Sequence, residues 1–103
     1  MAKVIGIDHL AIYVSHMDEA KEFFINGLGL TELSDYGEEY FMQAGKQTIA
    51  LFLGKNEEQT INHLALNVDN FEEISKRLES RGYKIYKGDM VDGPDGIRVQ
   101  LIS

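Results

Sequence analysis

The sequence contains no cysteine, no tryptophan and only one proline among its 103 residues. The absence of cysteine excludes a thiol nucleophile, a thiolate metal site and a disulfide framework. The sequence also lacks a run of about 18 apolar residues, which a membrane-spanning helix would need. The apolar run near the N-terminus is too short for a signal peptide. These absences are typical of a protein from a reducing compartment, and we expect a cytoplasmic one.

Basic residues are also few: 10 lysines and arginines stand against 17 acidic residues, which gives a formal net charge of −7. A chain of this charge repels phosphate backbones and anionic lipid. We therefore expect neither nucleic acid nor a membrane surface as a partner. The length and the hydrophobic content of 44% suit a single domain with one core.

One eight-residue segment occurs twice. Residues 7–14 read IDHLAIYV and residues 61–68 read INHLALNV, so a histidine, a leucine and an alanine recur at the same places. Such a repeat indicates two copies of one structural unit. We predict a single domain over residues 1–103, with a first module at about 1–54, a linker at about 55–60 and a second module at about 61–103.

Each repeat is followed by a helical pattern and then by strand patterns. Ser15 is expected to cap the first helix, whose apolar positions run from Met17 to Gly27. The second helix is expected to start around Asp69–Glu72 and to end at Arg81–Gly82. The expected strands cover residues 5–14, 30–33, 40–44, 47–53, 83–86 and 97–102.

The strand patterns separate an aliphatic face from a mixed face. In the first strand, Leu10, Ile12 and Val14 share one face, which suits packing against a helix. The opposite faces of four strands carry polar and small groups that folding does not require. We expect these faces to line a cavity, and their residues are His9, Ala11, Tyr13, Thr48, Ala50, Phe52, His63, Ala65, Asn67, Arg98, Gln100 and Ile102.

These residues also have a purely structural interpretation. A single histidine on a strand is usually a hydrogen-bonded structural residue, and duplication alone would preserve His9 and His63 without a function. Arg98 could bind an anionic group of a substrate or simply extend into solvent. Two histidines at equivalent positions nevertheless favour a functional site.

Several motifs together resemble one family. They are an Ile-Asp-His-Leu-Ala-Ile segment, a helix that ends in Gly-Leu-Gly-Leu, the second histidine segment and a closing Gly-Pro-Asp-Gly-Ile-Arg-Val-Gln-Leu. Over almost its whole length the chain resembles the vicinal oxygen chelate superfamily, which includes glyoxalase I, fosfomycin and bleomycin resistance proteins and extradiol dioxygenases. The resemblance implies an α+β fold of two βαβββ modules, whose curved mixed sheet forms a cup. It implies no single activity, because this scaffold hosts many reactions.

The resemblance also implies a divalent metal in the cup. The first-strand ligands of the family correspond to His9 and His63, and the last-strand acid of the second module corresponds to Gln100. The equivalent position in the first module is Ala50, which cannot bind a metal. Gln100 lacks the charge of an acid but can coordinate through its carbonyl oxygen. Such a set would hold Fe, Mn, Zn, Ni or Co.

Two functions follow from the resemblance. The first is a metal-dependent enzyme with dioxygenase-like or lyase/transferase-like chemistry on a substrate chelated through its oxygens. The second is a metal-free protein that binds or sequesters a small molecule, as the bleomycin resistance proteins do. The expected substrate-binding residues are Thr48, Ala50, Phe52, Asn67 and Arg98.

Proton-shuttling reactions are disfavoured because the family's ligand glutamate, which doubles as a base, is missing. The catalytic candidates that remain are Tyr13 and Glu39. Short modules leave free sheet edges, so we expect a homodimer. Few residues lie between Tyr83 and Gly96, which indicates that the second module could lack one strand.

Overall fold

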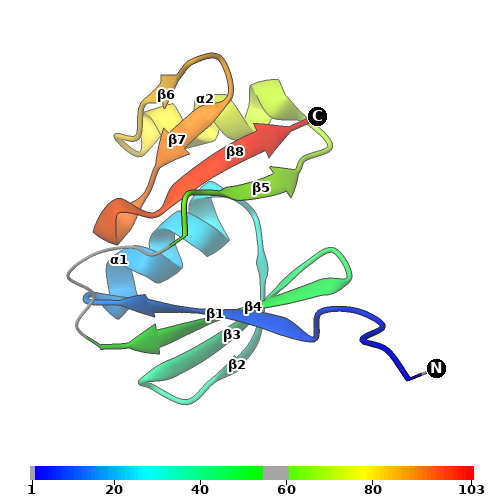
Figure 1. Ribbon diagram of the computed structural model, residues 1–103. Helices are drawn as coiled ribbons and strands as arrows, with labels where there is room; N and C mark the ends of the chain where they lie inside the picture. The colour runs from blue at the N-terminus through cyan, green and yellow to red at the C-terminus, as the bar shows by residue number, and fades with distance from the viewer. Residues whose placement is uncertain (1, 55–60) are drawn as a thin grey trace.

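The computed structural model describes residues 2–54 and 61–103 (Figure 1). Its first half has the order strand, helix and three strands. The helix changes from α-helical to π-helical geometry after its first turn. The elements are β1 (His9–Val14), α1 (Met17–Lys21), η1 (Glu22–Gly27), β2 (Thr31–Asp35), β3 (Glu39–Ala44) and β4 (Gln47–Leu53).

The second half repeats this order. A short 3₁₀ turn, η2, precedes the last strand and contains Asp95 with a positive φ of 59°. The elements are β5 (Leu64–Asn67), α2 (Phe71–Ser80), β6 (Ile85–Tyr86), β7 (Met90–Asp92), η2 (Pro94–Gly96) and β8 (Arg98–Ile102). The predicted linker at 55–60 lies outside the described residues.

The strands form two separate four-stranded sheets, in the orders β1-β4-β3-β2 and β5-β8-β7-β6. In each sheet the first and last strands of the half are parallel neighbours, and the other pairs are antiparallel. The α+β fold with two βαβββ units is therefore confirmed. The one curved sheet that the resemblance implies is divided into two sheets within a chain.

The aliphatic faces of both sheets contribute to one core, as the alternation predicted. Ile12 and Val14 of β1 and Val99 and Leu101 of β8 are at most 5% exposed and belong to the same apolar cluster as Phe23. Burial of such side chains contributes about 1.5–3 kcal/mol each. The first helix lies between the two sheets (Figure 1). The polar faces of both sheets consequently turn away from the shared core.

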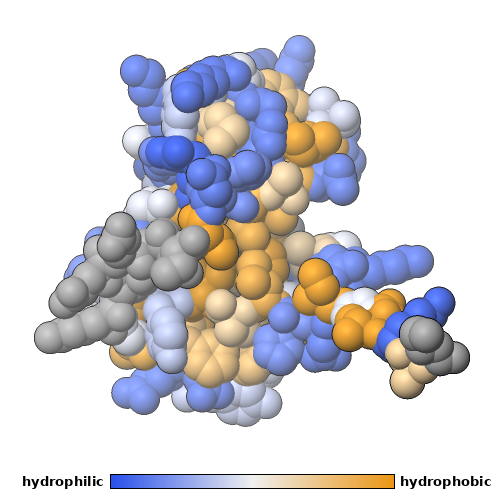
Figure 2. Space-filling model, viewed as in Figure 1, coloured by the Kyte–Doolittle hydropathy of each residue, from blue (hydrophilic) through white to orange (hydrophobic). Residues whose placement is uncertain are grey.

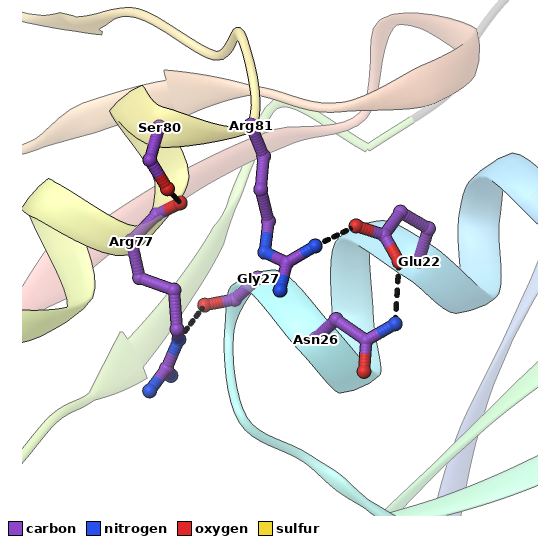
Figure 3. A network of polar contacts seen from close by, with 6 residues as sticks. All are labelled: Glu22, Asn26, Gly27, Arg77, Ser80 and Arg81. Carbon is purple, nitrogen blue, oxygen red and sulfur yellow. Dashed lines mark hydrogen bonds and ion pairs between the residues drawn. The ribbon is translucent and has the colours of Figure 1, made fainter.

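The two units meet mainly through their helices. The side chain of Arg77 on α2 donates from Nε to the carbonyl oxygen of Gly27 at 3.0 Å, and Arg81 pairs with Glu22 on η1 (Figure 3). The hydrogen bond from Asn26 and the pairing with Arg81 hold the pKa of Glu22 below its ordinary value. These contacts help to fix the position of the second sheet relative to the first.

The start of the first module differs from the prediction. Strand β1 begins at His9 rather than at residue 5, and residues 2–8 form no strand. The predicted cap at Ser15 is wrong, because His16 occupies the N-cap position and makes no side-chain cap hydrogen bond. Ser15 instead donates its backbone N–H to Asp95 at 3.0 Å. A contact between the two units therefore replaces a local cap.

The second module was expected to be able to lack one strand, but its sheet has four strands. Strand β7 pairs with β8 on one side and with the two-residue strand β6 on the other. Lys87 and Gly88, with φ values of 51° and 85°, allow the tight hairpin between β6 and β7. The predicted strand at 83–86 contains β6. Strand β7 was not predicted, because three residues are too few to show an alternating pattern.

Tyr40 is expected to make the protein sensitive to alkaline pH. The residue is 3% exposed. Burial, followed by a hydrogen bond with Glu32, raises the pKa of its hydroxyl group from 10.0 to about 12. Because the folded pKa exceeds the unfolded one, this stabilisation is complete below pH 10 and is lost as the pH rises towards 12. At pH 12 the loss amounts to about 2 kcal/mol.

Urea unfolding of wild type and Tyr40→Phe between pH 9 and 12 measures this loss of unfolding free energy. The exposed Tyr36→Phe should behave like wild type, and equal pH dependence in Tyr40→Phe would contradict the prediction.

Candidate metal and ligand site

The histidines of the repeated segment have equivalent positions in the two units. His9 is the first residue of β1, and His63 directly precedes β5. Both residues are exposed on the polar faces of their sheets. The side chain of His9 retains 42% of its accessible surface.

A hydrogen bond between Nδ1 and the side chain of the preceding residue orients each of the two imidazole rings. Nδ1 of His9 lies 2.8 Å from Oδ2 of Asp8, and Nδ1 of His63 lies 2.8 Å from Oδ1 of Asn62. A carboxylate or a carbonyl oxygen can only accept a hydrogen bond, so Nδ1 carries the proton in each ring. The lone pair of a neutral imidazole is then on Nε2, which is the atom able to bind a metal.

The rows of the first sheet separate His9 from the predicted catalytic residues. His9 lies beside Thr48 of β4, whereas Tyr13 lies beside Phe52, which in turn pairs with Glu39 of β3. The two rows are four residues apart along the strands, or about 13 Å. Tyr13 and Glu39 thus lie on either side of Phe52 in one row of the sheet. A substrate held at His9 would have to extend along the strands to reach them.

Aromatic rings fill the surface between these rows. Phe41 has its ring centroid 6.1 Å from each of the rings of His9, Tyr36 and Phe52, in edge-to-face arrangements. Ala50, the cross-strand partner of Phe41, is fully buried and therefore offers a ligand no surface within one chain. Phe41 and Tyr36 were not among the predicted site residues, because aromatic residues of strands and turns usually serve packing.

The second sheet confirms the predicted equivalence of the last strands. Ala11 pairs with Ala50 in the first unit, and Ala65 pairs with Gln100 in the second. Ala11 and Ala65 occupy the same place in the repeated segment, so Ala50 and Gln100 are equivalent. From the spacings along and between strands, the backbones of His63 and Gln100 are about 8 Å apart on the same face.

Two acidic residues that the sequence analysis did not select contact the last strand. Nε2 of Gln100 donates to Oδ2 of Asp89 at 3.0 Å. Asp92 accepts hydrogen bonds from Tyr86 at 2.6 Å and from Arg98 at 3.2 Å. The bond to Asp92 raises the pKa of both Tyr86 and Arg98. Arg98 is therefore already paired with an acid.

The described residues of one chain contain no group of three or more His, Asp or Glu side chains that could hold a metal ion. A cleft of about 550 Å³ lies between the two units, but its lining includes neither histidine. Of the predicted site residues it contains Ala65 and Asn67 of β5, opposite the turn around Gly45. The two polar faces, which both turn away from the shared core, do not form one enclosed site within a chain.

The comparisons with known proteins agree with this architecture. The sequence profile of the Glyoxalase/Bleomycin resistance protein/Dioxygenase superfamily matches residues 6–101. The chain belongs to this superfamily. The recognition of the vicinal oxygen chelate scaffold from its motifs is therefore confirmed. A search of curated protein sequences finds no significant match.

Solved structures of other proteins share the fold. The fosfomycin resistance protein FosX from Listeria monocytogenes is 19% identical, with 98% of this chain and 93% of that chain covered and a TM-score of 0.83. A possible glyoxalase from Bacillus cereus is 22% identical, with 97% and 100% covered and a TM-score of 0.80. Identities this low establish the fold alone. No helix in the described part of the chain is long and apolar enough to cross a membrane.

Proposed function

We propose that this protein is a metal-dependent enzyme that acts on a small molecule chelated through its oxygens. His9 of one subunit, together with His63 and Gln100 of the partner subunit, would hold a divalent ion in a homodimer. Fe, Mn, Zn, Ni and Co remain the candidate ions. When bound, the ion would supply a Lewis acid and a template for two substrate oxygens.

One observation carries this proposal: the matching orientation of the two imidazoles. Metal-binding histidines almost always donate their other ring N–H to a carboxylate or carbonyl oxygen, which fixes the tautomer. His9 and His63 both do so through the residue that precedes them, at 2.8 Å in each case. Structural histidines need no such agreement between the repeats, and both Nε2 atoms belong to exposed residues.

The donor set fits a divalent ion. Two imidazole nitrogens and one amide oxygen are borderline ligands that suit Fe, Mn, Co, Ni or Zn. Since the set is neutral, it would hold an ion less tightly than two histidines and a carboxylate. FosX from Listeria monocytogenes, which shares the fold, has a structure described as a complex with Mn(II) and a sulfate ion.

The reaction class follows from the residues around the histidines. Neither Ala50 nor Gln100 can move a proton, and Tyr13 and Glu39 lie about 13 Å along the strands from His9. Ring cleavage, or addition to an electrophile bound by the ion, therefore fits better than isomerisation. We propose that Thr48, Phe52, Asn67 and Arg98 contact the substrate. Ala50 could do so only if the aromatic rings around it move.

The free edges of β1 and β5 support the homodimer. Each is the outer strand of its sheet, and an outer strand presents unpaired backbone groups. The N-terminal segment, residues 2–8, extends from the body (Figure 1) and carries apolar side chains (Figure 2). Val4, Ile5 and Ile7 are 89%, 94% and 79% exposed. A second copy that pairs with this segment would cover both the edges and the apolar side chains.

The repeat suggests the register of this contact. If β1 and β5 of the partner subunit pair antiparallel with the two histidines opposite each other, residues six positions further also face each other. Lys3 then lies opposite Asp69 of the partner subunit, so that opposite charges meet. The segment would run along the cleft of about 550 Å³, which is lined by residues 65–69 of the partner subunit.

One observation favours a metal-free binding protein as the second candidate function. The rings of Tyr36, Phe41 and Phe52 form an aromatic surface beside His9. Such a surface can bind a flat or cationic ligand without any metal. In that case the histidines would act only as hydrogen-bonding groups.

Metal binding by the tag-free protein distinguishes the two functions. We expect about one ion per chain to remain after dialysis against Mn, Fe, Co, Ni or Zn, with a dissociation constant in the micromolar range or below. Elemental analysis and calorimetric titration measure these quantities. If none of the five ions binds with micromolar affinity, the enzyme proposal is wrong and the metal-free function is favoured.

A further inference from the structure

The acid that contacts Gln100 stands out among the polar groups of the second sheet. Asp89 lies in the loop between β6 and β7, and its Oδ2 accepts a partly buried hydrogen bond from Nε2 of Gln100 at 3.0 Å. The backbone carbonyl of Asp89 also accepts from the N–H of Leu101 at 2.8 Å. One side-chain and one backbone hydrogen bond thus tie Asp89 to β8, which restricts the position of the carboxylate.

This contact determines which way the amide of Gln100 is turned. An ionised carboxylate has no proton to donate, so the NH₂ group of the amide must face Asp89. The carbonyl oxygen is then on the other side of the amide group. That oxygen is the one atom of a glutamine side chain that binds a divalent metal ion well.

The carboxylates of Asp89 and the nearby Asp92 have partners of different charge. Asp92 lies within 3.2 Å of the guanidinium of Arg98, which balances its charge. The side chain of Asp89 instead accepts its hydrogen bond from a neutral amide. The negative charge of Asp89 therefore remains uncompensated by its partner, one side chain away from the carbonyl oxygen of Gln100.

We propose that Asp89 is a positioning residue for the metal ligand Gln100. It holds the amide with its oxygen towards the ion, polarises that oxygen through the N–H···O⁻ bond, and supplies the negative charge that a ligand glutamate would carry. This inference rests on the proposed function. It explains how a site with glutamine in place of the family's acid can bind a divalent ion.

Exchange of the two side chains tests the proposal. Loss of an outer-sphere partner typically weakens metal binding 10- to 100-fold, and we expect this loss of Mn²⁺ and Co²⁺ affinity in Asp89→Asn. The double variant Asp89→Asn/Gln100→Glu keeps one amide and one carboxylate but reverses their order. We expect it to bind the ions at least as tightly as wild type. Calorimetric titration gives the affinities, and the visible spectrum of bound Co²⁺ reports the ligand geometry.

The control variant is Asp92→Asn, which removes one acid from the same sheet without contacting Gln100. We expect less than a threefold change in affinity, and thermal unfolding without metal monitors the folding of each variant. If Asp89→Asn binds metal like wild type while His9→Ala and His63→Ala do not, the role of Asp89 is wrong and the proposed function stands. If neither histidine variant loses metal, the proposed function itself is wrong. A merely structural Asp89 would lower the melting temperature, and the exchange variant would not regain metal affinity.

Discussion

A mixture of the His9→Ala and His63→Ala variants is expected to bind metal, although neither variant binds metal alone. His9→Ala and His63→Ala protein, each purified without a tag, should each hold less than about 5% of the wild-type metal, because each variant removes one imidazole ligand. After joint unfolding and refolding of equal amounts, the mixture should regain about a quarter of the wild-type sites. Elemental analysis after dialysis measures both results.

The expected quarter follows from the symmetry of the proposed dimer. Random pairing of two variants makes half of the dimers mixed. In a mixed dimer one site loses both histidines, and the other site combines an intact His9 with an intact His63 of the partner subunit. One of two sites in half of the dimers gives a quarter of all sites.

Two controls make this result decisive. His16→Ala removes an exposed histidine outside the site and should keep its full metal content. Each variant refolded alone should remain without metal. If the single variants lose metal but their mixture regains none, the site lies within one chain and the shared site is wrong.

A charge in the N-terminal segment is expected to separate the subunits. Ile5 is 94% exposed within the chain, and in the proposed dimer it is covered by the partner's sheet edge. Burial of an isoleucine contributes about 1.5–3 kcal/mol, and each dimer contains two such contacts. Ile5→Asp should therefore raise the dimer dissociation constant at least a hundredfold and reduce metal binding in parallel. Analytical ultracentrifugation over a range of concentrations measures the first effect.

The control for Ile5→Asp is a second exposed apolar residue on the same module. Leu33 of β2 is 50% exposed and lies on the strand furthest from β1. Leu33→Asp should leave the dimer intact. Reversal of the proposed ion pair, with Lys3→Asp and Asp69→Lys together, should restore an association that either change alone weakens. A wild-type protein that remains monomeric at high concentration would contradict the proposed assembly.

Much of the fold could be predicted because the helices and strands of each module follow from short-range sequence patterns. Strand β4 (Gln47–Leu53) has the predicted bounds, since its alternation covers seven residues. Helix α2 ends just before the predicted Arg81–Gly82, and its N-cap Asn70 accepts a hydrogen bond from the N–H of Glu73 at 3.1 Å. Periodicity and capping are short-range properties, so they can be recognised without tertiary structure.

Other local signals were overridden by contacts between the modules. Ser15 looked like a helix cap, but its N–H donates to Asp95, which lies 80 residues further along the chain. Gly93 packs so closely against Phe23 that a Cβ at position 93 would lie 2.5 Å from the ring. The turn around Gly93 is therefore shaped by the first helix as well as by its own residues, and no pattern near Gly93 reveals this.

The sequence by itself determined the superfamily, the βαβββ order, and the strand faces on which His9, His63 and Gln100 lie. These properties depend on motifs and on a period of two along each strand. Only the tertiary structure decided that both sheets bury their aliphatic faces in one core, so that their polar faces turn outward within a chain. It also brought Asp89 to Gln100 and Asp95 to Ser15. Such pairings arise when hydrophobic burial packs distant segments together, and a side chain's neighbours across that packing are not encoded in its own stretch of sequence.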